Sequence, residues 1–102
     1  MSKKLRVKQT ARGFDLAEFE DGNGERCSLQ KSSAAERDMI WLGVNEPNPK
    51  IFPADGTGWH DYELPENVSC TTRMHLDRKQ VAALLPHLQA FVETGDIGDL
   101  AL

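Results

Sequence analysis

The sequence predicts a small α+β fold in which an antiparallel β-sheet of about four to five strands is packed by one amphipathic C-terminal helix. Three observations predict this class. Several short segments alternate apolar and polar residues, as half-buried strands do. Turn residues at 21–25 separate two such segments, and residues 78–93 repeat apolar side chains at helical spacing. The length of 102 residues fits a single domain, 1–102.

Besides the two segments that flank the turn at 21–25, three further segments predict strands. Residues 4–10 alternate Leu5 and Val7 with basic side chains, which indicates a strand with a basic outer face. Residues 39–44 are apolar on both faces, as in a central strand that is covered on both sides. Because one helix cannot cover both faces of a sheet, this segment also predicts a homo-oligomer. Residues 68–76 alternate again, and the side chains expected to face inward are Val68, Cys70, Thr72, Met74 and Leu76.

Residues 14–30 predict a β-hairpin for which two registers compete. A two-residue Asn-Gly loop would pair Phe19 with Ser28 and mix polar with apolar partners. A three-residue loop with Gly24 in the left-handed conformation pairs Phe19 with Cys27 instead, and gives one apolar face. We favour the second register, because a slip by one residue would turn every side chain to the other face. Its other pairs would be Ala17 with Leu29 and Glu20 with Arg26.

The predicted helix at 78–93 carries signals at both ends. Asp77 is a good N-cap, Gln80 stands at the capping-box position, and Gly95 suits the left-handed position after the last turn. Its apolar stripe, which we expect to anchor the sheet, consists of Val81, Leu84, Leu85, Leu88, Phe91 and Val92.

Two other regions lack such patterns. Residues 45–67 contain four prolines and two glycines and predict a long loop, which in a small domain is usually functional or mobile. Residues 96–102 predict a loose tail.

Composition excludes several classes of function. The formal net charge of −4 argues against non-specific DNA binding, which requires many phosphate contacts from Lys and Arg. No apolar run is long enough for an export signal or a membrane span, so we expect a cytoplasmic protein. In a reducing compartment, Cys27 and Cys70 are expected to be buried thiols.

The first candidate binding site lies on the outward face of the strand at 68–76. Arg73 and His75 are two residues apart, so they project to the same side. Together with Arg6 on the basic first strand they would hold an anion, because a guanidinium suits phosphate and carboxylate. The alternative is an ordinary solvated sheet face, on which these residues have no binding role.

The second candidate site is the sequence Lys31-Ser32-Ser33. Ser33 and Glu36 have capping-box spacing, which indicates a short helical turn whose N-terminus would hold phosphate. Ordinary capping by the serines is the alternative.

Two tryptophans complete the list of candidates. Trp59, in the long loop, would stack on a base or another planar ligand, or else fold back over the core. Trp41 is expected in the core. No catalytic triad motif and no zinc-type spacing is present, so we expect no enzyme activity, no metal site and no cofactor.

Three segments resemble small uncharacterised proteins of bacteriophages and prophages. They are QKSSA at 30–34, IWLG at 40–43 and MHLDRKQVAALLPHLQAFVETG at 74–95. The resemblance implies a phage accessory protein acting in the host bacterial cytoplasm. It implies no site residues, because no activity of that group is settled.

Three functions are therefore considered, and an enzyme that acts on a phosphate ester with His60 or His75 as acid or base ranks last among them. The first is a non-enzymatic, homo-oligomeric protein that sequesters a small anionic ligand, such as a nucleotide signal of host antiviral immunity. The second is an inhibitor that binds a host defence enzyme through the acidic stretches, for example 61–66.

Overall fold

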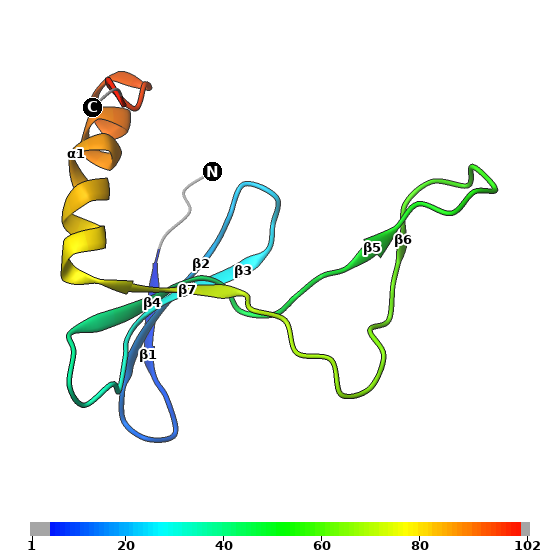
Figure 1. The fold of residues 1–102 in the computed structure, drawn as a ribbon, viewed down its shortest axis with the longest axis horizontal. Coiled ribbons are helices and arrows are strands. Elements are labelled where there is room, and N and C mark those ends of the chain that lie inside the picture. The colour runs from blue at the N-terminus through cyan, green and yellow to red at the C-terminus, as the bar shows by residue number, and fades with distance from the viewer. Residues whose placement is uncertain (1–4, 101–102) are drawn as a thin grey trace.

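The computed structural model of the chain describes residues 5–100 and has the α+β fold that the sequence predicts (Figure 1). Five antiparallel strands form the main sheet in the order β1-β2-β3-β4-β7, and β5 and β6 form a separate two-stranded sheet. One helix, α1, follows β7. The elements are β1 (Arg6–Gln9), β2 (Asp15–Glu20), β3 (Arg26–Lys31), β4 (Met39–Val44), β5 (Lys50–Ile51), β6 (His60–Asp61), β7 (Arg73–Asp77) and α1 (Arg78–Thr94).

The β2–β3 hairpin has the register that the apolar pattern favoured. Phe19 pairs with Cys27, and the flanking pairs follow in step. The backbone N–H of Asp21 donates to the carbonyl of Glu25 at 3.0 Å, which closes a three-residue loop. Gly24 has φ +84°, the left-handed conformation that this loop requires. The prediction of the register is confirmed.

The pairing of the strands separates the side chains of the main sheet into two faces. Residues directly opposite one another in an antiparallel sheet point to the same side. The apolar face carries Val7, Ala17, Phe19, Cys27, Leu29, Ile40, Leu42, Val44, Met74 and Leu76, with the polar residues Gln9, Asp15 and Lys31 toward one end of their strands. The polar face carries Arg6, Lys8, Leu16, Glu18, Ser28, Gln30, Trp41, Gly43, Arg73 and His75.

The caps of α1 are as predicted, but its packing is not. Asp77 accepts from the backbone of Gln80 at 2.8 Å, the Gln80 side chain accepts from the backbone of Asp77 at 2.9 Å, and Gly95 ends the helix with φ +81°. However, α1 projects from the end of β7 and does not lie over the sheet (Figure 1). No residue of α1 is buried, so the expected anchoring of the sheet by this helix is wrong for the single chain.

Three smaller predictions are also wrong. Residues 32–38 form a loop with no helical turn: the backbone N–H of Ser32 donates to the carbonyl of Met39 at 2.9 Å, which continues the β3–β4 pairing into this segment. The inner strand β4 is only half-buried, because no second layer covers it. Cys27 is buried as expected, but Cys70 is exposed because regular strand structure begins only at Arg73.

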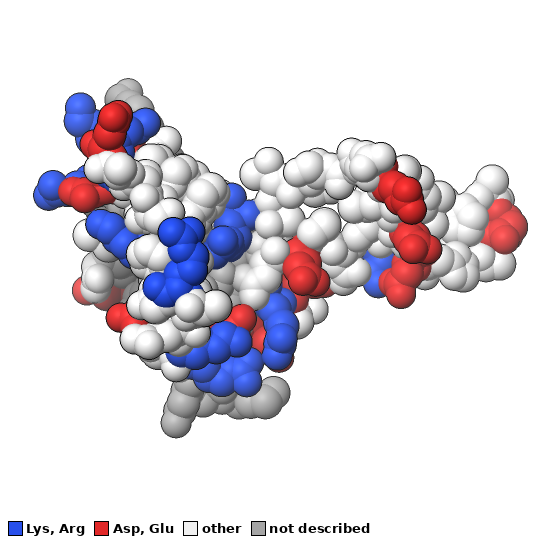
Figure 2. Space-filling view, turned by 90° about the horizontal axis from the view of Figure 1, so that it is seen from below, with Lys and Arg blue, Asp and Glu red and all other residues white. Residues whose placement is uncertain are grey.

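Residues 45–67 form an arm that extends from the sheet (Figure 1). Strands β5 and β6 give this predicted loop a short hairpin, joined by an ion pair between Lys50 and Asp61. Five acids and one base lie in this arm, so it carries a charge equal to the −4 of the whole chain. Figure 2 accordingly shows Asp and Glu along the arm, whereas Lys and Arg gather over the body of the molecule.

The end of the chain turns back along α1. His87 Nδ1 lies 2.8 Å from the carbonyl oxygen of Ile97, and Gly98 lies close to Ala90. The last two residues of the predicted tail, 101–102, lie outside the described residues. Within residues 5–100, no helix combines the length and the apolar character that crossing a membrane would require.

Candidate ligand-binding site

The candidate site begins with a glycine on the polar face. Ser28, Gly43 and Arg73 stand side by side on β3, β4 and β7. Since Gly43 places no side chain between its neighbours, Arg73 reaches across β4 to β3. A Cβ on Gly43 would lie 3.0 Å from the Arg73 Cα and 3.0 Å from the Thr72 carbonyl oxygen. Gly43 also has φ +146°, which side chains rarely adopt, so this close approach of β7 requires glycine.

Arg73 is held in place by two neutral partners. Its Nη1 donates to Gln30 Oε1 at 2.9 Å and to Ser28 Oγ at 3.3 Å. Ser28 is only 1% exposed and lies beneath the guanidinium. The Arg73 Cζ also lies 5.5 Å from the centre of the Trp41 ring, which is within the range of a cation–π contact. These contacts fix the side chain, and none of the three partners carries a negative charge.

His75 and Trp41 form the second part of the site. Their rings stack at 3.9 Å with an angle of 14° between the planes. His75 Nε2 lies 2.9 Å from Ser32 Oγ, and Ser32 Oγ also accepts the backbone N–H of Ala34 at 3.2 Å. Trp41 therefore belongs to the polar face, where His75 covers part of it, and the expectation that it lies in the core is wrong.

A hollow of about 280 Å³ opens beside these residues. The turn between β1 and β2 contributes one wall, where the Arg12 Cζ lies 5.9 Å from the centre of the Phe14 ring. This volume is near the lower limit for small-molecule pockets. We call it the Trp41 hollow, and the residues that line it are Thr10, Ala11, Arg12, Phe14, Gln30, Lys31, Ser33, Trp41 and Arg73.

The Trp41 hollow has an unbalanced positive charge. Among the described residues, no carboxylate lies within ion-pair distance of Arg12 or Arg73. Lys31 has one partner, Asp38, at 3.5 Å, and both side chains are exposed. Two guanidiniums that are always protonated therefore line a small hollow, and none of the described residues that line it is an acid.

Glu18, an acidic side chain on the same face, is neutralised by a partner outside the hollow. Glu18 Oε1 lies 2.7 Å from Lys8 Nζ, and Glu18 Oε2 accepts from Asn45 Nδ2 at 3.2 Å. The hydrogen bond from Lys8 is the main reason that the pKa of Glu18 falls below its ordinary value. This buried carboxylate is thus already satisfied and does not compete for the arginines of the hollow.

The structure brings together five of the seven residues that the sequence indicated. Arg73, Lys31 and Ser33 line the Trp41 hollow, while His75 and Ser32 support Trp41 from beside it. The other two are elsewhere. Arg6 is on the same face, but β1 and β7 are opposite edges of the sheet, roughly 19 Å apart at four strand spacings. Trp59 is on the arm, against Phe52.

Six residues of the site were missed by the sequence reading: Thr10, Ala11, Arg12, Phe14, Gln30 and Trp41. The signal for Trp41 was present, because β4 alternates once Gly43 is taken as a point of close approach. The positions of Arg12 and Phe14 depend on how the β1–β2 turn curls, which no local pattern specifies.

The described residues contain no group of three or more His, Cys, Asp or Glu side chains placed to hold a metal ion. The hollow instead presents cationic, amide, hydroxyl and aromatic groups, the chemistry that binds an anion with a planar ring. No protein-family model, curated protein or solved structure matches this chain.

Proposed function

We propose that this chain is a non-enzymatic, phage-type accessory protein that binds and sequesters a small anionic ligand in the Trp41 hollow. The ligand class we propose is a nucleotide, such as a signal of host antiviral immunity, in the bacterial cytoplasm. One observation carries the proposal. Arg73 is half-buried, held by neutral partners and over the Trp41 ring, yet no described carboxylate balances its charge.

The preference for a nucleotide follows from the two kinds of group in the hollow. Arg12 and Arg73 offer forks of donors that suit phosphate oxygens. Phe14 and Trp41 offer ring faces on which a base stacks, whichever base it is. A plain anion would use only the first set, so the combination favours a ligand that has both a phosphate and a ring.

The arrangement of Ser32 and His75 favours binding over catalysis. A serine beside a histidine can act as a nucleophile with its base. Here, however, Ser32 is buried and already accepts the Ala34 N–H. Its hydroxyl supports the His75 ring against Trp41 and does not face the hollow. We therefore assign this pair to the positioning of Trp41.

The phage context rests on the resemblance of residues 30–34, 40–43 and 74–95 to small phage proteins. These segments supply much of the site. The first contains Gln30, Lys31 and Ser33, and the second contains Trp41. The third begins immediately after Arg73.

A second candidate function is supported by the arm at 45–67. Trp59 and Phe52 are exposed there in edge-to-face contact, and the surrounding charge is acidic. Exposed aromatic residues within an acidic surface suit a basic protein partner, such as a host defence enzyme. In this function the Trp41 hollow would have no role.

Titration calorimetry with a panel of nucleotides tests the proposal. The panel contains mononucleotides, cyclic mononucleotides and cyclic dinucleotides, with inorganic phosphate alongside. We expect at least one nucleotide to bind, and Arg73→Ala to weaken that binding roughly 10- to 150-fold, the loss of one charge-assisted hydrogen bond.

Arg6→Ala is the matched control, because it removes the same charge from the same face at the opposite edge. Equal weakening by both variants would indicate attraction by overall charge and would contradict a defined site. If no nucleotide binds, while reversing the charges of Glu63 and Glu66 slows association with a protein partner, the second function replaces the first.

A further inference from the structure

The single chain exposes far more surface than a folded monomer of its mass. Its accessible surface is 8576 Å², whereas a monomer of 11.4 kDa exposes about 5,800 Å². Its radius of gyration is 17.2 Å, against about 13 Å for a compact chain of this length. The excess of roughly 2,800 Å² per chain is on the scale that obligate subunits bury against one another.

Part of this exposed surface consists of large apolar side chains on α1 and on the apolar face of the main sheet. The stripe of α1, which a folded domain would normally bury, is open to solvent, and Val92 is 80% exposed. The apolar face of the sheet is open as well, with Val7 72% exposed and Met74 51% exposed. Soluble monomers rarely leave contiguous apolar patches of this extent uncovered.

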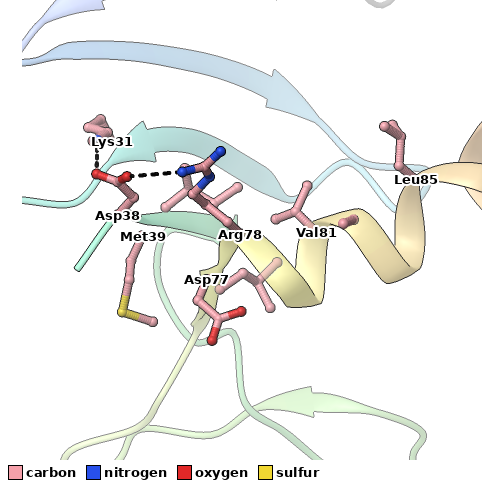
Figure 3. Close-up of a pocket in the computed structure, with 10 residues that line it drawn as sticks. Lys31, Asp38, Met39, Asp77, Arg78, Val81 and Leu85 are labelled. Carbon is pink, nitrogen blue, oxygen red and sulfur yellow. Dashed lines mark hydrogen bonds and ion pairs between the residues drawn. The ribbon is translucent and has the colours of Figure 1, made fainter.

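The two apolar surfaces meet in one groove (Figure 3). A hollow of about 570 Å³ lies where α1 leaves the sheet, and its walls include Leu76 and Ile40 from the sheet and Val81 and Leu85 from the helix. A second hollow of about 420 Å³, lined by Val7, Ala17, Leu29 and again Ile40, continues it across the apolar face. Val81 and Leu85 project from the same side of α1 in this view.

The helix of the same chain cannot cover this groove. Asp77 is the last residue of β7 and also the N-cap of α1, so no connecting residue allows the helix to fold back. The capping box fixes Asp77 and Gln80, and Arg37 Nη2 holds the Asp77 carboxylate at 3.0 Å. Covering the apolar face with its own helix would require this cap to unfold.

We propose that a second copy of this chain occupies the groove, with the apolar stripe of each α1 packed on the apolar face of the other copy's sheet. One chain carries both the apolar ridge and the apolar groove, so a twofold arrangement satisfies both surfaces in both copies. The rim of the groove carries both signs of charge, through Lys31, Asp38 and Arg78 (Figure 3). Such a rim is compatible with facing its own copy.

The dimensions of the two surfaces agree. A helix of 17 residues is about 26 Å long. Five strands span roughly 19 Å across the sheet. The helix is therefore long enough to cross all five strands of the partner. The polar face points away from this interface. Packing each α1 on the partner's sheet therefore leaves the Trp41 hollow open, and the proposed dimer does not depend on the proposed ligand.

Light scattering of the purified protein and its variants tests the proposed dimer. We expect the wild type to have twice the mass of 11.4 kDa, or an even multiple of it, and a melting temperature that rises with protein concentration. Leu88→Glu places a charge in the apolar stripe and should abolish the dimer. Ala83→Glu adds the same charge on the opposite side of α1 and should leave it intact.

A second measurement does not depend on the variants folding. In a mixed sample of isotope-labelled and unlabelled wild type, we expect intermolecular NOEs between methyl groups of Leu85 or Leu88 and those of Leu29 or Met74. A monomeric wild type overturns the proposal. A dimer that survives Leu88→Glu, or that shows no NOEs between α1 and the partner's sheet, overturns it as well.

Discussion

Within one chain, the polar face of the five-stranded sheet has its side chains paired with one another, whereas the apolar face stays exposed. On the polar face, Lys8 neutralises Glu18, Arg73 covers Ser28, and His75 stacks on Trp41. On the apolar face only Cys27 is buried among the described apolar residues of the chain. Hydrogen bonds and ion pairs are made locally between neighbouring strands, but hydrophobic stabilisation requires a second layer. The contacts within this chain are therefore enough to order the polar face, whereas the apolar face needs a second layer to be stabilised.

The largest difference between the faces should appear in Leu85→Ala. Leu85 is 57% exposed in the single chain, so on its own it would contribute little to stability. If a second copy covers it, truncation should cost roughly 2–5 kcal/mol. Leu100→Ala is the control, since Leu100 is equally exposed at 57% and lies outside the stripe. Chemical denaturation measures both. Equal and negligible effects would mean that nothing covers α1.

The polar face should be most sensitive at Gly43. Gly43→Ala forces the new Cβ against the backbone of β7 at 3.0 Å, in a conformation that alanine rarely adopts. We expect a loss of about 2–4 kcal/mol from overpacking and backbone strain together. Gly22→Ala is the control, because a Cβ there meets nothing within 4 Å. Thermal unfolding of the two variants measures the difference in their stability. If they melt alike, β7 does not approach β4 as described.

The ion pair on the polar face should make stability depend on pH. Because the pKa of Glu18 is lowered in the folded state, mainly by its hydrogen bond from Lys8, the unfolded chain takes up this proton first as the pH falls. The contribution of Glu18 is thus complete above the ordinary glutamate pKa and is lost as the pH falls through the lowered value. Glu18→Gln should flatten the acid limb of the stability curve.

Glu20→Gln serves as the comparison for this effect, because no ion pair of Glu20 is present among the described residues. Denaturation curves between neutral and acid pH should keep their slope in this variant. The same slope in Glu18→Gln as in the wild type would contradict a folded-state role for the Glu18–Lys8 pair.

The last prediction concerns the reactivity of the two thiols, which measures their burial in the unmodified protein. Cys27 lies on the apolar face, where burial raises the pKa of its thiol and disfavours the reactive thiolate. Cys70 is exposed, and we expect one thiol per chain to react quickly with a colorimetric thiol reagent. Denaturation should release the second. Two fast thiols would mean that β3 is not packed as described.

Local patterns in the sequence predicted the elements of the fold well. The hairpin register followed from keeping Phe19 and Cys27 on one face, and the helix ends followed from Asp77 and Gly95. The packing of α1 was not predictable in the same way. An apolar stripe looks the same in sequence whether its own sheet or another surface covers it. The sequence already predicted the direct junction, because the strand was expected to end at residue 76 with Asp77 as the N-cap of the helix. The structure adds the direction of α1, which leaves this junction without lying over its own sheet (Figure 1).

The candidate site was predicted in part, for a related reason. Alternation placed Arg73 and His75 on one side, as observed. It also grouped them with Arg6, which the strand order places at the opposite edge. Strand order depends on contacts between distant parts of the chain, so periodicity within one strand does not reveal it. Trp41 was assigned to the core because β4 is apolar throughout, although its neighbour on the polar face is His75.

Native mass spectrometry of the protein purified from bacterial lysate tests both faces in one spectrum. We expect an even number of chains of 11.4 kDa, carrying additional mass from a bound ligand. Arg73→Ala should lose that ligand but keep the number of chains, whereas Arg6→Ala should keep both. Single chains without added mass would contradict the account of both faces. Ligand retained equally by Arg73→Ala and the wild type would contradict the assignment of the site to the Trp41 hollow.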